Sequence, residues 1–376
     1  MELPPTLHPR AHPTDEELCW CLSGQPYSEC HKNREKQKKA NPKQALDILA
    51  KQFRKKIGCL HPNSPEGCSG KIINSHTIQK SGPLKTIAKN GEVYSMKGAG
   101  DRLVENMGKL IPQKKGISTV SVFPGFCAHH DNAFFSPIEN GKFEITRENC
   151  FLLHYRNVCS ELHAKKSMQF GEHILSIIDS GRGKSDQFLA QQQAADMNFG
   201  ASMAEKELEA SRDQLNAYWI AKDFSSISFY FIEFENQLPF VGSFSATPKF
   251  SFAGDKIQDW SEEILKGVSF SSVNFDGKSG FVISSTDQDL MDLLSSELED
   301  LLIGNPSNIL RWSVSNAENL AFNIDWWDHL SDKRRKHILD LAMIGMPVDD
   351  IADEIELYLS AVEVLPKARL SRSLKL

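Results

Sequence analysis

The chain has 376 residues, of which 40% are hydrophobic and 24% charged, with a mean hydropathy of -0.37. This length is sufficient for two or three domains with at least one sizeable core, and the composition excludes a wholly disordered, fibrous or membrane protein. No apolar run approaches the roughly 20 residues that span a bilayer, and the first thirty residues lack an apolar signal core. We therefore expect a cytoplasmic protein that makes no membrane contact.

The charge is unevenly divided along the chain. Residues 1–166 carry a net charge of +9 and residues 167–376 a net charge of -15, and all eight cysteines lie between Cys19 and Cys159. In a reducing compartment, cysteines serve more often as metal ligands or buried thiols than as disulfides. We expect a basic, metal-binding first half that faces a polyanion, joined to an acidic half that need not do so.

Hydrophobic spacing predicts the elements in chain order. The patterns indicate a basic amphipathic helix at 42–56, an irregular region at 57–147 with strand-like pieces at 71–73 and 119–123, helices over 147–222 with a break at 180–183, strands between 227 and 284, and helices at 290–302, 334–343 and 351–362. Asp276-Gly277 is a hairpin turn signal, and phenylalanines at alternate positions from Phe224 to Phe281 indicate a sheet core. The last ten residues, rich in Lys, Arg and Ser, are expected to be loose.

Four metal-type side chains lie within thirteen residues near the N-terminus: Cys19, Cys21, Cys30 and His31. Three thiols and an imidazole so close together can form a tetrahedral Zn²⁺ site, with Ser23-Gly24 as the turn that folds the second pair back. Such a site has no open coordination position, so we expect it to be structural. The alternative is three incidental thiols on a flexible arm.

This stretch resembles the SEC-C zinc motif. That motif combines Cys-x-Cys, a Ser-Gly turn, an aromatic residue (here Tyr27), and a Cys followed by Cys or His, and every element is present. The resemblance implies a small zinc-bound adaptor that binds a protein partner rather than catalysing a reaction.

A second set of metal-type residues is widely spaced along the chain. Cys59 and Cys68 flank a loop that contains Pro and Gly, and Cys127-x-x-His130 follows about fifty residues after the strand-like segment that ends at His76. The segment after Cys127 leads into 133–135, where we expect a helix to begin. A knuckle, a hairpin and a helix whose first turn completes the metal site make up a treble-clef zinc fold, which we prefer to coincidence.

At these positions the chain resembles the HNH, or ββα-metal, endonucleases. The resemblance implies that His76 activates a water as general base, and that Asp131, with His129 or Asn132, holds a catalytic Mg²⁺ or Mn²⁺ ion. It also implies a structural zinc ion held by Cys59, Cys68, Cys127 and His130. A neutral imidazole can take a proton from water near pH 7, and a cation offsets charge on the phosphate.

Three features depart from that resemblance. Ser75 stands where the family usually has an acidic residue, eight residues rather than two separate Cys59 from Cys68, and the insertion between the two halves is long. The sequence therefore supports a zinc site more strongly than it supports a cleavage site. A structural histidine remains the alternative for His76.

Basic residues between the two Cys/His sets form the densest positive stretch of the chain. Lys51, Arg54, Lys55 and Lys56 belong to it, and we interpret them as contacts to nucleic acid phosphates rather than as a merely solvated face. Arg156 is placed to clamp a phosphate or to pair with a nearby acidic residue such as Glu139.

A helix near residue 155 carries two further Cys/His pairs at four-residue spacing: Cys150 with His154, and Cys159 with His163. The two pairs lie nine residues apart and so face different directions on a helix. We therefore do not expect the pairs to bind a metal, and we interpret Cys150 and Cys159 as core thiols.

Together these patterns predict an α+β protein in four parts. They are a SEC-C-like zinc motif with its lead-in (1–40), a treble-clef ββα domain with flanking helices (41–170), a helical connector (171–222) and an acidic domain of antiparallel sheet plus helices (223–376). We expect two structural Zn²⁺ ions and a metal-dependent endonuclease acting on DNA or RNA. By analogy, such a protein serves in defence against phage. The alternative is a non-catalytic, zinc-scaffolded adaptor that binds nucleic acid or protein.

Overall fold

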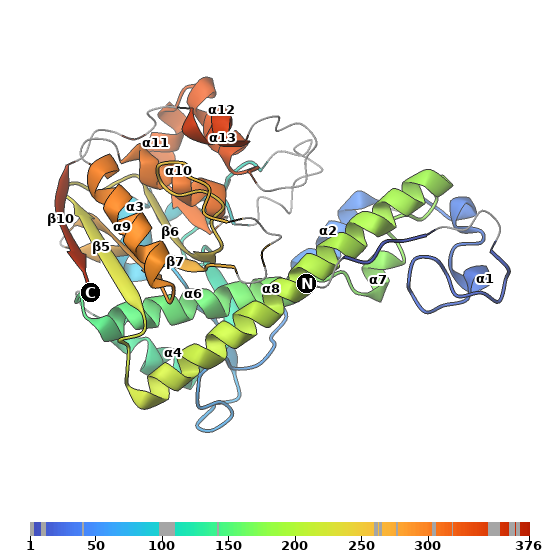
Figure 1. Cartoon of the computed structure of the whole chain (residues 1–376), viewed down its shortest axis with the longest axis horizontal. Helices are drawn as coiled ribbons and strands as arrows, with labels where there is room; N and C mark the ends of the chain where they lie inside the picture. Colours follow the sequence, from blue (N-terminus) through green and yellow to red (C-terminus); the bar gives the residue numbers. More distant parts are fainter. Residues whose placement is uncertain are drawn as a thin grey trace. The chain divides into compact units, whose positions relative to one another are not determined.

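The computed structural model describes residues 4–8, 13–39, 41–97, 110–140, 143–258, 262, 265–275, 277–302, 306–317, 319–344, 354–360, 365 and 369–376. The fold is α+β, as the sequence predicts, and divides into two compact units (Figure 1). The first comprises residues 1–55 and 162–210, and the second comprises residues 56–161 and 211–376. The division falls inside two long helices, α6 (Arg147–Met168) and α8 (Lys184–Ala221).

The first unit is helical. Besides its parts of α6 and α8 it contains α1 (Tyr27–Cys30), the 3₁₀ turn η1 (Arg34–Lys36), α2 (Pro42–Gln52) and α7 (Glu172–Leu175). Lys166 pairs with Glu209 at 2.5 Å, and Asn198 exchanges two hydrogen bonds with the backbone of Phe170. These contacts hold the end of α6 against α8, on either side of the break predicted at 180–183.

The second unit contains a ββα arrangement. Strand β1 (Ile72–His76) pairs antiparallel with β4 (Val122–Cys127), and α4 (Ala128–Phe134) follows β4 directly. A bulge between Ile73 and Ser75 interrupts the pairing. The predicted hairpin-and-helix order is therefore confirmed, but α4 begins five residues before the predicted start at 133, because Cys127 caps its first turn.

An eight-stranded sheet fills most of the second unit. The strands that form it are β2 (Glu92–Ser95), β3 (Gln113–Gly116), β5 (Ser228–Phe234), β6 (Phe240–Ala246), β7 (Val268–Phe275), β8 (Lys278–Ser285), β9 (Leu320–Phe322) and β10 (Leu370–Lys375), in the spatial order β10-β5-β8-β7-β6-β9-β2-β3. Its pairings are antiparallel. Strands β2 and β3 come from the long insertion between β1 and β4, so that insertion extends the sheet.

The other elements that the structure describes in this unit are helices and helical turns. They are η2 (Lys80–Leu84), α3 (Lys85–Ile87), α5 (Ser136–Glu139), α9 (Gln288–Leu302), α10 (Ser307–Asn316), α11 (Ile324–His329), α12 (Asp332–Leu341) and α13 (Glu354–Leu359). None of the helices among the described residues is long and apolar enough to cross a membrane.

The two faces of the central strands differ in character. Phe270 and Phe281 point into a large apolar core with Leu294 of α9, as the period-two phenylalanine pattern predicts. On the other face Asn157 of α6 donates hydrogen bonds to the hydroxyls of Ser269 and Ser271 at 2.8 and 2.9 Å. A buried polar layer thus joins α6 to the sheet, because Ser269 and Ser271 of β7 lie on the face opposite to Phe270.

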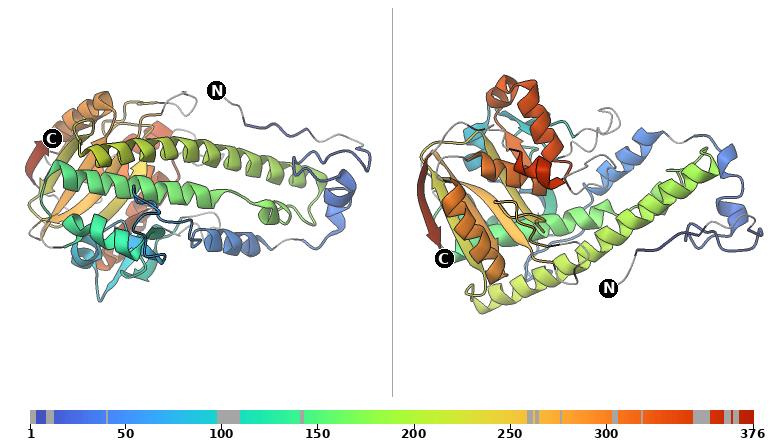
Figure 2. Two further views of the ribbon diagram at one scale, coloured as in Figure 1. Left: turned by 90° about the horizontal axis from the view of Figure 1, so that it is seen from below. Right: turned by 45° about the horizontal axis from the view of Figure 1, so that its top comes forward.

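The C-terminal residues are not loose, contrary to the sequence-based expectation. Leu370–Lys375 form β10, which pairs with β5 from Leu370↔Phe234 to Lys375↔Tyr230 at one edge of the sheet (Figure 2). Only two of its six residues, Leu370 and Leu374, are apolar, so the strand forms through backbone pairing that completes the hydrogen bonds of β5. The segment has no β-branched or aromatic residue and no apolar alternation, so its own sequence did not indicate a strand.

Candidate metal centres

The first cluster brings together the four predicted ligands near the N-terminus. The ligand atoms of Cys19, Cys21, Cys30 and His31 all lie within 4.8 Å of one another. Nδ1 of His31 is 3.1 Å from both Cys19 Sγ and Cys30 Sγ, and the Sγ atoms of Cys21 and Cys30 are 3.5 Å apart. A tetrahedral Zn²⁺ site requires S···S separations of about 3.8 Å and S···N separations of about 3.5 Å. The cluster fits zinc with shifts of a few tenths of an ångström.

Short-range backbone contacts fold this motif. An isolated bridge joins Leu18 to Pro26, and the N–H of Cys19 donates to the carbonyl of Gln25 at 2.8 Å. Gly24 adopts φ +72°, which favours glycine at the predicted turn. The loop closes so tightly that Cys30 and His31, at the end of α1, return beside the first two cysteines.

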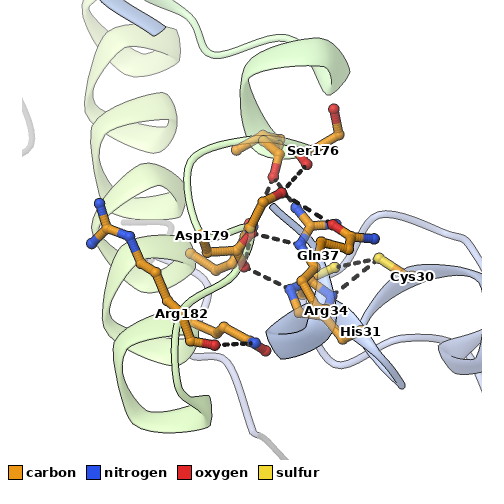
Figure 3. A network of polar contacts seen from close by, with 12 residues as sticks. Cys30, His31, Arg34, Gln37, Ser176, Asp179 and Arg182 are labelled. Carbon is orange, nitrogen blue, oxygen red and sulfur yellow. Dashed lines mark hydrogen bonds and ion pairs between the residues drawn. The ribbon is translucent and has the colours of Figure 1, made fainter. Parts of the chain in front are cut away.

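A buried carboxylate contacts the imidazole of this cluster (Figure 3). Asp179, from the turn between α7 and α8, accepts a hydrogen bond from His31 Nε2 at 2.8 Å and another from Arg34 Nε at 2.6 Å. Burial lowers the pKa of His31, but Asp179 and the neighbouring thiols outweigh this and raise it to about 10. Zinc binding therefore displaces a proton from this imidazole.

The second cluster joins residues that are as much as 71 positions apart in the sequence. The ligand atoms of Cys59, Cys68, Cys127 and His130 lie within 4.8 Å of one another. Nδ1 of His130 is 3.5 Å from both Cys59 Sγ and Cys68 Sγ, which matches the S···N edge of a zinc tetrahedron. The predicted ligand set is thus gathered in one place and could hold zinc.

The ββα arrangement accounts for this convergence. Cys127 ends β4 and caps α4, and its thiol accepts from the N–H of His130 in the first turn. The N–H of Leu60 donates to the carbonyl of Gly125 at 2.8 Å, which fixes the Cys59 end of the loop beside β4. Burial raises the pKa of Cys127, but hydrogen bonds from the His130 and Ser69 backbone outweigh it and lower the pKa to about 7. A thiolate is therefore accessible near neutral pH.

Two residues of the loop pack on the imidazole of this cluster. His61 does not join the four ligands; its ring stacks on that of His130 with centroids 3.9 Å apart. Gly67 adopts φ +69°, and a Cβ there would lie 3.3 Å from His130 Nε2. A larger residue at position 67 would be strained and would crowd the ligand.

The four predicted catalytic residues lie on the same ββα scaffold. His76 ends β1 and is half-buried, while His129, Asp131 and Asn132 lie in α4, with His129 and Asn132 exposed. Burial raises the pKa of Asp131; the Ser75 hydroxyl, Arg156 and His76 act in the opposite direction. Within the described part of the chain, the two Cys/His clusters are the groups compact enough to hold a metal ion. His76, His129, Asp131 and Asn132 do not form such a group there.

The residues predicted to contact nucleic acid fall into two environments. Lys51, Arg54, Lys55 and Lys56 are exposed. Arg156 is 2% exposed, forms an ion pair with Glu139 and stacks over Phe135 with its guanidinium 5.0 Å from the ring centroid. The pairing predicted for Arg156 is therefore present, while its contact with phosphate stays a prediction.

The Cys and His side chains of α6 are core residues, as expected from the sequence for Cys150 and Cys159. Cys150, His154, Cys159 and His163 are all buried. His154 Nδ1 contacts the Ser284 hydroxyl at 2.8 Å, and His163 Nε2 donates to the Lys55 carbonyl at 3.0 Å. None of the four belongs to a metal-type group within the described residues.

Comparison with known proteins finds one short motif. Residues 17–33 match the SEC-C motif, and these residues contain the whole first cluster. The chain matches no curated protein and no solved structure. The match covers only the zinc-binding motif. It does not include the ββα arrangement or the eight-stranded sheet.

Proposed function

We propose that the second unit is a zinc-stabilised, metal-dependent endonuclease of HNH-like type that hydrolyses phosphodiester bonds in DNA or RNA. The observation that supports this most is the joint placement of His76, at the end of β1, and Asp131, in the first turn of α4, beside a Cys₃His cluster. Strand end and helix start are the two places from which such an enzyme contributes its general base and its metal ligand.

The environment of His76 suits a general base. Its Nε2 lies 3.1 Å from the carbonyl oxygen of Ile117, which can only accept, so Nε2 carries the proton and Nδ1 holds a lone pair. Burial lowers the pKa of His76, which keeps the ring neutral near pH 7. Nδ1 can therefore take a proton from an attacking water. A divalent cation held by Asp131, with His129 or Asn132, would offset charge on the phosphate.

The basic segment supports a nucleic acid substrate. Lys51, Arg54, Lys55 and Lys56 are exposed and directly precede Cys59 in the chain. Each lysine or arginine near a phosphate adds affinity that is independent of sequence and falls with salt. The SEC-C motif would bind a protein partner, and by analogy the whole protein would act in the cytoplasm against phage nucleic acid.

A second function is favoured by one observation. Ser75 replaces the carboxylate that the nuclease resemblance implies next to His76, and it lies buried on β1. With one carboxylate fewer, the site would bind a catalytic cation less well. The protein would then be an adaptor that binds nucleic acid or protein without cutting, with both zinc clusters as its scaffolds.

Plasmid nicking separates the two functions. Purified protein with Mg²⁺ or Mn²⁺ should convert supercoiled plasmid to the nicked form, and His76→Ala should abolish this while bound zinc stays unchanged. His173→Ala, which removes an exposed histidine of α7, is the matched control and should nick normally. If plasmid is retarded in a gel but stays supercoiled with every metal, and a labelled RNA also stays intact, the nuclease proposal is wrong and the adaptor stands.

Phage challenge tests the biological role separately. Cells that express the chain should plate fewer phage than cells that express His76→Ala at the same level. Equal plaque counts would remove the defence proposal without affecting the biochemical one.

A further inference from the structure

Asp179 is a buried carboxylate outside the matched SEC-C residues. It lies 148 positions after His31 and its side chain is 0% exposed. It accepts three hydrogen bonds: two from His31 Nε2 at 2.8 Å and Arg34 Nε at 2.6 Å (Figure 3), and one from Gln191 Nε2 at 2.9 Å. A carboxylate removed from water needs such partners, because burial without them would be costly.

These contacts decide which nitrogen of His31 faces the cysteines. Arg34 is always protonated and keeps Asp179 ionised, so both carboxylate oxygens can only accept. The hydrogen on the His31–Asp179 bond therefore belongs to Nε2. In the zinc-bound, neutral imidazole the lone pair is then on Nδ1, which is the atom 3.1 Å from Cys19 Sγ and Cys30 Sγ.

The turn that carries Asp179 is packed against the residues that follow the motif. The N–H of Gly181 donates to the Arg34 carbonyl at 3.0 Å, and Arg34 Nη2 donates to the Leu175 carbonyl at 2.7 Å. Gly181 adopts φ +70°, and a Cβ there would lie 2.6 Å from the backbone of Lys39. Only glycine permits this approach, so the motif and the turn form one packed structure around the His31–Asp179 contact.

We propose that Asp179 is a positioning residue for the first metal site. It holds His31 with Nδ1 toward the zinc ion and couples zinc occupancy to the packing of the turn at 175–183. Arg34 completes the arrangement, since three thiolates, Zn²⁺ and Asp179 together leave a negative charge that its guanidinium offsets in part. Carboxylates that accept from metal-bound histidines typically raise metal affinity 10- to 100-fold.

Chelator competition measures this effect directly. Two zinc ions per chain should be resolved, and Cys30→Ser and Cys68→Ser assign each to its cluster. Asp179→Ala should weaken the first site about 10- to 100-fold and leave the second unchanged. Asp179→Asn keeps the side-chain volume and one acceptor oxygen, so it should reduce the zinc affinity of the first site less than Asp179→Ala does. The control Asp186→Asn alters an exposed acid in the first turn of α8 and should change neither site.

A double-mutant cycle separates positioning from general support of the fold. His31→Cys replaces the imidazole with a thiolate that needs no orientation, so Asp179→Ala in that background should cost no zinc affinity. Nitrogen-15 shifts of His31 should show a protonated Nε2 and a metal-bound Nδ1 in the native protein. An equal loss in both backgrounds, no loss in either, or a metal-bound Nε2 would overturn the proposal.

Hydrogen exchange tests the coupling to the turn. Removing zinc from the first site should speed exchange of the amides at 175–183, and restoring zinc should slow it. If the exchange rates at 175–183 are the same with and without zinc, zinc occupancy of the first site and packing of the turn are independent.

Discussion

Acidification should destabilise the protein through His154. This side chain is buried between α6 and β8, where Nδ1 contacts the Ser284 hydroxyl at 2.8 Å, and burial lowers its pKa to about 4. In the unfolded chain a histidine has a pKa of about 6.5. Between these values the unfolded state binds more protons than the native state, so stability falls as pH falls from about 6.5 to about 4.

The size of the effect follows from the pKa difference. Each unit is worth about 1.4 kcal/mol, so His154 costs about 2 kcal/mol of the free energy of unfolding between pH 7 and pH 5, and about 3 kcal/mol by pH 4. Urea unfolding at pH 7, 6 and 5, with zinc present, measures this. His154→Gln keeps a polar group near Ser284 without titrating, so its stability should fall about 2 kcal/mol less over the same range. Identical pH profiles for both proteins would refute the assignment.

Three further changes test the packing and the metal centres. Phe270→Ala removes a buried ring from the main apolar core and should destabilise the protein by about 3–5 kcal/mol in urea unfolding, whereas a loss under about 1 kcal/mol would contradict the role of β7 in that core. Asn157→Ala leaves the Ser243 hydroxyl, which donates to Asn157 Oδ1 at 2.5 Å, without that acceptor and should cost about 2 kcal/mol, while an unchanged denaturation midpoint would show that the polar layer is dispensable. Cys68→Ser should retain one zinc ion and melt at a lower temperature, and full zinc content would place the second ion elsewhere.

Local signals predicted the metal clusters well. Cys19, Cys21, Cys30 and His31 are close in sequence, so their spacing alone restricts the geometry. The second cluster was predictable because the Cys127-x-x-His130 spacing suits a helix start that follows a strand. In both cases Cys and His side chains are grouped at spacings that suit zinc, and metal binding is the role that such groups most often have.

Long-range contacts were not predictable in the same way. Asp179 lies in a turn with no metal-type neighbours in sequence, and only the packing of that turn on Arg34 brings it to His31. The same holds for β2, whose Tyr94 pairs with Phe322 of β9 across most of the chain. Periodicity indicates that a segment is a strand, but not which strand it joins.

The zinc K-edge X-ray absorption of the purified protein, together with its metal content, tests the central claim most directly. Two zinc ions per chain with an average shell of three sulfurs at about 2.3 Å and one nitrogen at about 2.0 Å would agree with two Cys₃His centres. Fewer than two ions, or a shell made mainly of oxygen and nitrogen, would contradict the proposal that these distant side chains converge to bind zinc.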